Sequence, residues 1–273
     1  AGLFKPASIT GTVFVDANNN GILDAGETRL PNVTITLTGT DGAGNSVTRT
    51  VTTAPDGTYT FDNLVPGSYT VSEAQPSGYL DGKDSIGNSG GTLANDSISS
   101  INLVSGSAVT DVNFGELPPA KLGDRVWIDA NANGKQDALE ANAAGVTVEL
   151  YASVAGLATG SALASTTTNS YGNYEFAGLA AGSYIVKFIT PTGFLLSAAN
   201  LGGDDSQDSD AAAAGTTSTY TLTYGQNDPT VDAGLFKPAS ITGTVFVDAN
   251  NNGILDAGET RLPNVTITLT GTD

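Results

Sequence analysis

Residues 32–40 read NVTITLTGT, a stretch in which apolar side chains alternate with threonines. The same alternation returns at residues 57–64 (GTYTFDNL), 67–73 (GSYTVSE) and 100–104 (SINLV). A period of two places successive side chains on opposite faces, so these segments are typical of strands that bury one face. Because Thr, Val, Tyr and Ile also favour extended backbone, the pattern predicts a β-sheet protein.

A second set of segments follows the same plan later in the chain. They are GVTVELYAS (145–153), GNYEFAGL (172–179), GSYIVKF (182–188) and STYTLTY (218–224). Gly, Pro, Asn and Asp separate the segments in both sets, as expected of turns. Many short strands within roughly 110 residues predict a β-sandwich, so we expect an all-β chain of antiparallel β-sandwiches in tandem.

The chain also contains an internal repeat. Residues 1–41 reappear without a change as residues 233–273, and VFVDANNNGILDAGE (13–27) has a divergent relative, VWIDANANGKQDALE, at 126–140. Self-similarity of this kind indicates a repeat architecture. We interpret the chain as a window on a longer array of nearly identical units, with an artificial duplication as the alternative.

The repeats divide the chain into three predicted segments. A first domain covers 1–118, a second covers 119–236, and 237–273 is the incomplete start of a third repeat, identical in sequence to the N-terminal copy. Short linkers with Pro (LPPAK, LFKPA) mark the two boundaries and predict a semi-rigid rod. The third segment should hold about two strands, which would lack the partners needed to bury their apolar face.

The charge of the chain is strongly acidic. It has 28 Asp and Glu against 10 Lys and Arg, a formal net charge of −18. Nucleic acids and anionic membranes are bound through clustered Lys and Arg, so we expect neither as a partner. An acidic surface instead favours divalent cations, which would also relieve its self-repulsion.

Three residue types are missing, and their absence excludes several functions. The chain has no Cys, no His and no Met. A Ser-His-Asp triad and the common zinc sites are therefore excluded. No dinucleotide-binding fingerprint, membrane-spanning apolar run or signal peptide is present in the sequence. These observations do not favour an enzyme.

The segment DANNNGILDAGE, residues 16–27, has the spacing of an EF-hand calcium loop. Oxygen-bearing side chains stand at loop positions 1, 3, 5, 9 and 12, and Gly21 at position 6 permits the sharp turn. Position 7 offers only a backbone carbonyl, which is why Ile22 can be replaced by Lys135 in the second copy. Hard oxygen ligands in this number suit Ca²⁺ better than Mg²⁺. A solvated turn rich in Asp and Asn is the alternative.

The pattern occurs three times, and we predict one calcium site in each copy. The predicted ligands are Asp16, Asn18, Asn20, Ile22, Asp24 and Glu27 in the first loop; Asp129, Asn131, Asn133, Lys135, Asp137 and Glu140 in the second; and Asp248, Asn250, Asn252, Ile254, Asp256 and Glu259 in the third.

The flanks of these loops are strand-like, with VFVD before the first loop and NVTITL after it. Sensor EF-hands work by moving two helices. An EF-hand-like loop placed between strands therefore favours a structural staple over a switch.

A second acidic stretch, GGDDSQDSD, occupies residues 202–210. Carboxylates this close repel one another unless a cation lies among them, so we predict a further calcium site here, with a mobile acidic loop as the alternative. If the last strand returns beside this stretch, two later aspartates join it. The candidate ligands are Asp204, Asp205, Asp208, Asp210, Asp228 and Asp232, with Asp81 and Asp84 in the corresponding part of the first domain.

Together these motifs resemble the B-type repeat domains of Gram-positive serine-aspartate-repeat surface adhesins and their relatives in giant bacterial surface proteins. The likeness lies in the pattern G-x-V-F/W-V/I-D-x-N-x-N-G-x-x-D, then PNVTITL or AGVTVEL, then GxYxFxxLxxGSYxV, and spans nearly the whole chain. It implies an immunoglobulin-like or prealbumin-like β-sandwich that is stabilised by calcium. It also implies an extracellular place, on a bacterial surface or surface appendage.

Three functions compete. A calcium-stabilised structural repeat of a stalk, fibre or filament would have neighbouring copies of itself as partners, in the same chain or in a fibre. An adhesin module would bind a host or neighbouring-cell ligand, but no exposed aromatic patch is evident, and we expect the single Trp127 in the core. A glycosidase with paired carboxylates is the third. We favour the structural repeat.

Overall fold

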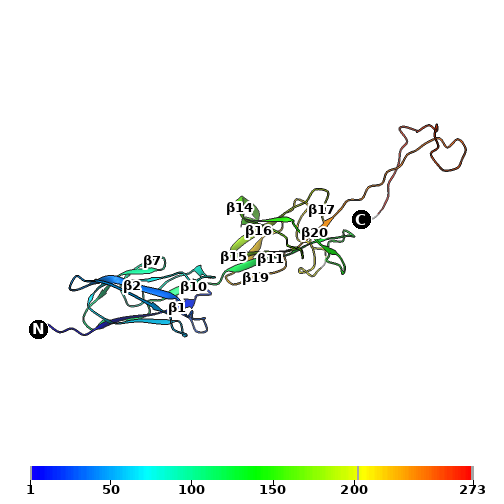
Figure 1. The fold of residues 1–273 in the computed structure, drawn as a ribbon. Coiled ribbons are helices and arrows are strands. Elements are labelled where there is room, and N and C mark those ends of the chain that lie inside the picture. Colours follow the sequence, from blue (N-terminus) through cyan, green and yellow to red (C-terminus); the bar gives the residue numbers. More distant parts are fainter. Residues whose placement is uncertain (1, 202, 272–273) are drawn as a thin grey trace. The chain divides into compact units, whose positions relative to one another are not determined.

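The computed structural model describes residues 2–201 and 203–271, and its described part consists of strands and loops without a helix (Figure 1). The predicted all-β class is therefore confirmed. Accordingly, no described helix has the length and apolar character needed to cross a membrane.

The first sandwich is built from two five-stranded sheets. One has the order β4-β1-β10-β6, with β9 also paired to β1, and the other has the order β3-β2-β5-β8-β7. The bounds are β1 Ala7–Val15, β2 Thr34–Asp41, β3 Ser46–Thr52, β4 Thr58–Leu64, β5 Gly67–Glu73, β6 Leu80–Asp81, β7 Thr92–Ala94, β8 Ser97–Leu103, β9 Ala108–Val109 and β10 Phe114–Leu117.

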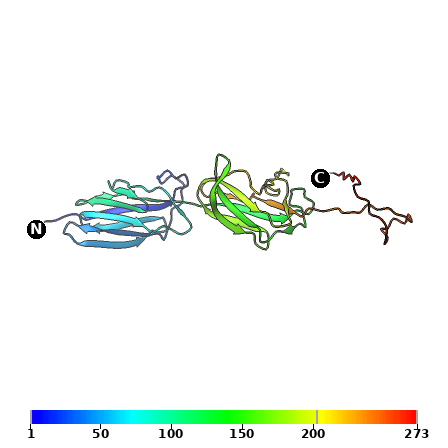
Figure 2. The same ribbon diagram turned by 90° about the horizontal axis from the view of Figure 1, so that it is seen from above.

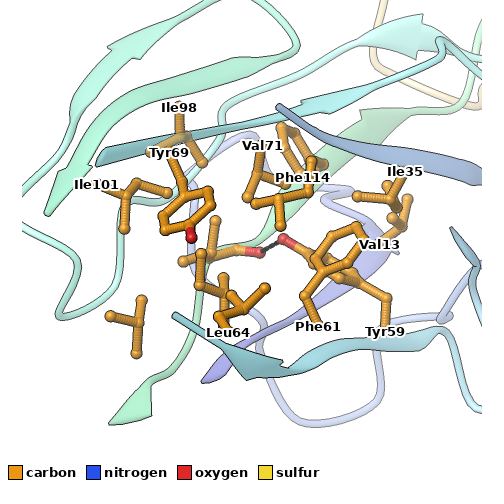
Figure 3. Close-up of a cluster of buried hydrophobic side chains, with 14 of the residues drawn as sticks. Val13, Ile35, Tyr59, Phe61, Leu64, Tyr69, Val71, Ile98, Ile101 and Phe114 are labelled. Carbon is orange, nitrogen blue, oxygen red and sulfur yellow. Dashed lines mark hydrogen bonds between the residues drawn. The ribbon is translucent and has the colours of Figure 1, made fainter. Parts of the chain in front are cut away.

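The inward faces of the two sheets form one hydrophobic core, as Figure 3 shows. Phe61 and Phe114 come from the first sheet, and Ile35 and Tyr69 from the second. All four side chains are buried, because alternate residues of each strand face the opposite sheet. The hydroxyl of Tyr59 donates a 2.6 Å hydrogen bond to the carbonyl of Val112 inside this core.

The second sandwich, drawn mostly in green and yellow in Figure 2, has two sheets. One is six-stranded, with the order β12-β11-β20-β17 and with β15 and β19 also paired to β11, and the other is four-stranded, with the order β14-β13-β16-β18. Trp127 lies fully buried in β11, as predicted. The bounds are β11 Ala120–Ile128, β12 Ala141–Asn142, β13 Thr147–Val154, β14 Leu157–Thr167, β15 Asn173–Leu179, β16 Gly182–Ile189, β17 Leu195–Leu196, β18 Tyr220–Leu222, β19 Asn227–Asp228 and β20 Ala233–Phe236.

Most strand pairs are antiparallel, but the first strand of each sandwich also pairs in parallel with the last. Val13 lies opposite Phe114 in the first sandwich, and Val126 lies opposite Ala233 in the second. The strands that lead into the loops at 16–27 and 129–140 are therefore held by the C-terminal strand of their own sandwich.

The eight segments identified by their alternation all contain strands, although β8 begins earlier, at Ser97. Strands β3 and β14, which form the edges of their sheets, are not among these segments. Strand β14 is almost wholly exposed, and β3 has only two partly buried valines, Val47 and Val51, so the apolar alternation of both is weak.

The third segment differs from the expectation of about two strands. Its described residues, 237–271, contain no strand, and one isolated bridge joins Phe246 to Arg261. Residues 272 and 273 lie outside the description. Ile267 and Leu269 are 73% and 78% exposed, whereas the identical residues of the first copy, Ile35 and Leu37, are fully buried. The physical reason is that the partners of the first copy come from residues 46–117, which have no counterpart here.

Candidate metal centres

The loop at 16–27 begins at the end of β1, where Asp16 is buried. Its carboxylate accepts hydrogen bonds from the backbone N–H groups of Asn20 (3.0 Å) and Gly21 (2.6 Å). Asn18 and Asn20 each accept a backbone N–H two residues ahead through their side-chain oxygens. These local bonds fold the segment back on itself.

The C-terminal half of the loop turns its acidic side chains toward the same space. Asp24 accepts the side-chain amides of Asn18 and Asn20 at 2.9 and 2.8 Å, and these two bonds lower the pKa of Asp24. Glu27 accepts the N–H of Ala17 through Oε1 (3.1 Å) and that of Asp24 through Oε2 (2.9 Å). Five predicted side-chain ligands thus converge within one closed loop.

The second and third loops repeat this arrangement. Asp137 accepts the amides of Asn131 and Asn133 at 2.9 and 2.8 Å, and Asp256 accepts those of Asn250 and Asn252 at 2.8 and 2.7 Å. Glu140 and Glu259 close their loops as Glu27 does, and Asp129 and Asp248 accept the N–H groups at positions 5 and 6. The third loop keeps this geometry without flanking strands, so the loop shape is encoded locally.

Backbone conformation explains part of the loop sequence. Gly21, Gly134 and Gly253 at position 6 have φ values of 79°, 75° and 76°, in the left-handed region that favours glycine. A Cβ on Gly134 would also lie 2.6 Å from the carbonyl oxygen of Ala198. Position 11 is left-handed as well, and the second loop places Leu139 there, with φ 80°.

The donor set fits a hard cation. Asp, Asn and Glu provide oxygen ligands, and the side chains of Ile22 and Ile254 at position 7 are 61% and 63% exposed, which leaves that position to its carbonyl. In this structure Asn18 and Asn20 turn their amide nitrogens to Asp24, and their oxygens accept backbone N–H groups. A bound Ca²⁺ would take those amide oxygens together with the carboxylate oxygens as ligands. Calcium binding and its ligands remain predictions.

The second acidic stretch is brought together only in part. Carboxylate oxygens of Asp205, Asp208 and Asp210 lie within 4.8 Å of one another. Asp204 instead closes a local turn with Ser206, and Asp228 accepts the hydroxyl of Thr230.

The last strand does return beside this stretch. The N–H of Asp232 donates to a carboxylate oxygen of Asp210 at 2.7 Å, while Asp232 Oδ1 accepts the N–H of Arg125. Burial raises the pKa of Asp210 to about 7, and burial with the charge of Asp124 raises the pKa of Asp232 to about 9. These carboxyls are costly to ionise without a cation beside them.

In the second sandwich, the loop at 129–140 is in direct contact with the acidic cluster at 205–210. The N–H of Gln136 donates to the carbonyl of Gln207 (2.8 Å), and the N–H of Ser209 donates to the carbonyl of Gly134 (2.9 Å). The loop at 129–140 and the cluster at 205–210 therefore share one short backbone ladder.

In the first sandwich, Asp81 and Asp84 are joined by Asp96, which was not among the predicted ligands. Oxygens of the three lie within 4.8 Å of one another. Burial raises the pKa of Asp84 to about 7, and burial followed by the charge of Asp96 raises that of Asp81. Asp96 comes from the turn between β7 and β8, outside the acidic stretch that contains Asp81 and Asp84, so the spacing within that stretch did not reveal it.

Two buried glutamates extend this group and were also not predicted. Glu73, Asp96 and Glu116 form a second set with oxygens within 4.8 Å. A signal was present: Glu73 is in phase with the buried Tyr69 and Val71, and Glu116 with the buried Phe114, so the alternation places both carboxyls inward. Burial and the charge of Glu116 raise the pKa of Glu73 to about 10, and burial raises that of Glu116 to about 8.

Comparison with known proteins places the chain in a family. A family profile described as "SdrD B-like domain" matches residues 7–115 and again residues 120–235. Serine-aspartate repeat-containing protein D of Staphylococcus aureus strain Newman is 36% identical over 274 aligned positions, covering 98% of this chain and 20% of that protein. Serine-aspartate repeat-containing protein F of Staphylococcus epidermidis is 35% identical, covering 96% and 15%. The chain thus spans about a fifth or less of the length of these relatives.

Solved structures give weaker likenesses. The shaft pilin SpaA from Lactobacillus rhamnosus GG is 12% identical, with 88% of this chain and 100% of that chain covered and a TM-score of 0.38. A streptococcal ancillary pilin is 17% identical, with 86% and 63% covered and a TM-score of 0.36. Because these TM-scores are low, the family assignment rests on the sequence matches alone. Two profile matches that cover most of the residues, and relatives above 30% identity, show that the chain belongs to the SdrD B-like domain family.

Proposed function

We propose that this chain is a calcium-stabilised structural repeat of an extracellular bacterial stalk, fibre or filament. A place outside the cell, on the surface or an appendage, follows from its family. The observation that carries the calcium proposal is the recurrence of one closed, oxygen-lined loop in three copies, of which the second has diverged in sequence. A bare turn would not need the same five side chains each time.

The proposed unit is the repeat. We propose that residues 1–118 form the first repeat, that residues 119–236 form the second, and that residues 237–273 are the start of a third. The two sandwiches each hold a separate hydrophobic core, and two residues, Pro118 and Pro119, lie between β10 and β11. Two prolines restrict the backbone there, which supports semi-rigid spacing of neighbouring repeats.

Each loop would bind its ion through carboxylate, amide and backbone carbonyl oxygens. In the first loop these are Asp16, Asn18, Asn20, the carbonyl of Ile22, Asp24 and Glu27. The ion would supply positive charge among three carboxylates and so stabilise the folded loop. Ile22 can vary because its side chain points to solvent.

The loop ties two sheets together, which supports a structural role. It runs from the end of β1 in one sheet to the segment that enters β2 in the other. The residues on either side are strands, and no described helix is present to move. If the free calcium concentration is about 100 times the dissociation constant of a site, binding stabilises the folded state by roughly 2.7 kcal/mol per site.

The relatives that match are serine-aspartate repeat-containing proteins, and we propose no enzymatic reaction for this chain. Neighbouring copies of the repeat are the proposed partners, in the same chain or in a fibre, as the tandem arrangement of the family supports.

Single-molecule stretching of the full chain tests this function. We expect two sandwich unfolding events, with forces that drop when calcium is replaced by a chelator and recover when it is restored. The variant Glu27→Gln should lose the calcium response of the first sandwich. The matched control is Asp62→Asn, which neutralises an exposed carboxyl of the same sandwich outside the loops and should keep that response.

Equal forces with and without calcium would rule out a calcium-stabilised stalk. Saturable binding of a host protein by this chain would favour the adhesin alternative.

A further inference from the structure

Each of the three loops has an asparagine followed directly by a glycine at positions 5 and 6. The pairs are Asn20-Gly21, Asn133-Gly134 and Asn252-Gly253, and no other Asn of the sequence precedes a Gly. An asparagine side chain reacts with the backbone most readily at such a pair, because glycine has no Cβ to hinder the approach to its nitrogen. The loops therefore hold the asparagines of the chain that are most prone to lose their amide.

The reaction converts the asparagine to an acid and releases ammonia. In the first loop, the backbone N–H of Gly21 gives its proton to hydroxide, and the nitrogen attacks Cγ of Asn20. A bond from this nitrogen to Cγ forms, the bond from Cγ to Nδ2 breaks, and Nδ2 takes a proton from water and leaves as ammonia. Water then opens the five-membered imide at either of its carbonyls, which gives aspartate or isoaspartate. Water is the one reagent that the reaction consumes.

The closed loop opposes this reaction at both reacting groups. The N–H of Gly21 donates to Oδ2 of Asp16 at 2.6 Å, and Nδ2 of Asn20 donates to Oδ2 of Asp24 at 2.8 Å. Oδ1 of Asn20 also accepts the N–H of Ile22 at 2.7 Å, which fixes the side-chain amide. Removal of the Gly21 proton would place a second negative charge beside the Asp16 carboxylate. The reaction therefore requires the loop to open.

The same three bonds occur in the other two loops. Gly134 and Gly253 donate to Asp129 and Asp248 at 2.8 and 2.7 Å, the amides of Asn133 and Asn252 donate to Asp137 and Asp256 at 2.8 and 2.7 Å, and their oxygens accept the N–H groups of Lys135 and Ile254, both at 2.8 Å. Protection from within the loop is thus alike in all three. Differences in reactivity must come from the surroundings of each loop.

The second loop is held most firmly by its surroundings. The carbonyl of Gly134 accepts the N–H of Ser209 at 2.9 Å, and the N–H of Gln136 donates to the carbonyl of Gln207 at 2.8 Å. Gly134 is buried, and a Cβ at this residue would lie 2.6 Å from the carbonyl oxygen of Ala198. Opening of this loop therefore breaks tertiary hydrogen bonds in addition to the local ones.

The first and third loops have the same sequence but different surroundings. In the first, Asp16 is buried, and its N–H donates to the carbonyl of Glu116 at 2.8 Å. In the third, Asp248 is exposed, and apart from chain neighbours no described atom lies within 4 Å of the Cβ position of Gly253. Because the residues of the two loops are identical, any difference in their rate of opening arises from structure alone.

We propose that Asn20, Asn133 and Asn252 are sites of spontaneous deamidation gated by the opening of their loops, with Asn252 reacting first and Asn133 last. A group that reacts only in the open loop is converted in proportion to the population of that open state. Aspartate adds a negative charge at position 5, and isoaspartate adds one carbon to the main chain there. Closing of the loop does not reverse either change, so deamidation marks a repeat whose loop has opened.

Peptide mapping of the full chain by mass spectrometry tests this order after incubation at mildly alkaline pH in chelator. Trypsin places the three sites in separate peptides, 1–29, 126–135 and 188–261, since it does not cut the Lys-Pro bonds. Each event shows as the mass increase from replacement of NH2 by OH. We expect Asn252 to react about tenfold faster than Asn133, which corresponds to about 1.4 kcal/mol in loop opening, with Asn20 between them.

Two controls separate loop opening from sequence. In concentrated urea, Asn20 and Asn252 should react at equal rates, because their neighbours in sequence are identical. Asp24→Ala removes the acceptor of the Asn20 amide and should speed deamidation at Asn20, with Asn252 unchanged as the internal standard. Asn45, which precedes Ser46, gives the rate of an exposed asparagine that lacks the following glycine.

Equal rates at Asn20 and Asn252 in the folded chain would overturn the proposal, as would the fastest reaction at Asn133. Rates at all three sites no higher than at Asn45 would overturn it as well. The proposal depends on closure of the loops by hydrogen bonds and not on a metal. The expected order in chelator, without slowing on addition of calcium, would therefore support it while contradicting calcium binding by the loops.

Discussion

The backbone N–H of Asp16 donates a 2.8 Å hydrogen bond to the carbonyl oxygen of Glu116. Asp16 opens the first candidate calcium loop, and Glu116 lines the buried carboxylate group, so one hydrogen bond connects the two. The second sandwich has the equivalent bond from Asp129 to Leu235, at 2.9 Å. In both sandwiches the loop is therefore anchored on the last strand.

The contact between the loop at 129–140 and the cluster at 205–210 makes a prediction about local stability. Glu140→Ala removes the side chain that closes the loop, so the amides of Gln136 and Ser209 should exchange faster with solvent in the presence of calcium. Hydrogen exchange followed by NMR measures this directly. The amide of Thr168, bonded to Val146 on another part of the sandwich, is the internal control. Unchanged protection at Ser209 would show that the loop and the cluster are independent.

Leu139 is expected to be replaceable with a gain in stability. Its φ of 80° costs about 1–2 kcal/mol for a residue with a Cβ, its side chain is fully exposed, and the other two loops have Gly26 and Gly258 there. Leu139→Gly should therefore stabilise the second sandwich by roughly 0.5–1 kcal/mol after the entropy cost of glycine.

Denaturant unfolding monitored by Trp127 fluorescence reports on this sandwich alone, since the chain has one Trp. Gly26→Leu, the reverse change in the first loop, should leave the Trp127 transition in place. A lower midpoint for Leu139→Gly would contradict the strain that we assign to this position.

The buried hydroxyl of Tyr174 is expected to contribute to the stability of the same sandwich. Its hydroxyl donates to the carbonyl of Val231 at 2.7 Å inside the core, as Tyr59 does to Val112 in the first sandwich. Tyr174→Phe leaves that carbonyl without its partner and should cost about 1–3 kcal/mol. Tyr184→Phe, which removes a partly exposed bond to Ala180, is the control and should cost less. The reverse order of the two losses would count against the buried bond.

Stability without calcium should fall as the pH rises from 6 to 8. Glu73, Asp84 and Glu116 have folded-state pKa values of about 10, 7 and 8, above the unfolded value of about 4. In this window the folded state retains protons that the unfolded state has released, so each rise in pH favours unfolding. The chain has no histidine to titrate over the same range.

Thermal unfolding in chelator at several pH values measures this slope. Saturating calcium should remove most of it, because a bound cation favours the ionised carboxylates. An equal slope with calcium and with chelator would show that the buried carboxyls hold protons rather than an ion.

Much of the fold could be predicted because its signals are local. Alternation in segments such as 32–40 and 67–73 marked the central strands, and the spacing of Asp, Asn, Gly and Glu marked the loops. Edge strands β3 and β14 were missed because they bury little apolar surface: β3 has only two partly buried valines, Val47 and Val51, and β14 is almost wholly exposed. The third segment shows the limit of local signals: its loop closes as predicted, but its strand-forming residues remain exposed without partners.

The buried carboxylate group depends on contacts that spacing does not encode. Glu73, Asp96 and Glu116 come from distant parts of the chain, and a glutamate within a strand usually faces solvent, although the phase of these two points inward. Acidic density alone was also a poor guide, since Asp204 and Asp228 make local bonds and lie outside the group of Asp205, Asp208 and Asp210. The calcium ligands and the repeat boundaries stay predictions.

The most direct test of the calcium staple is the thermal unfolding midpoint of the full chain in calcium and in chelator. One site occupied at about 100 times its dissociation constant contributes roughly 2.7 kcal/mol, which for a sandwich of this size corresponds to a shift on the order of 10 °C. We predict that chelation lowers the midpoint of each sandwich by at least this amount and that added calcium restores it. A midpoint that is the same in calcium and in chelator would contradict the account.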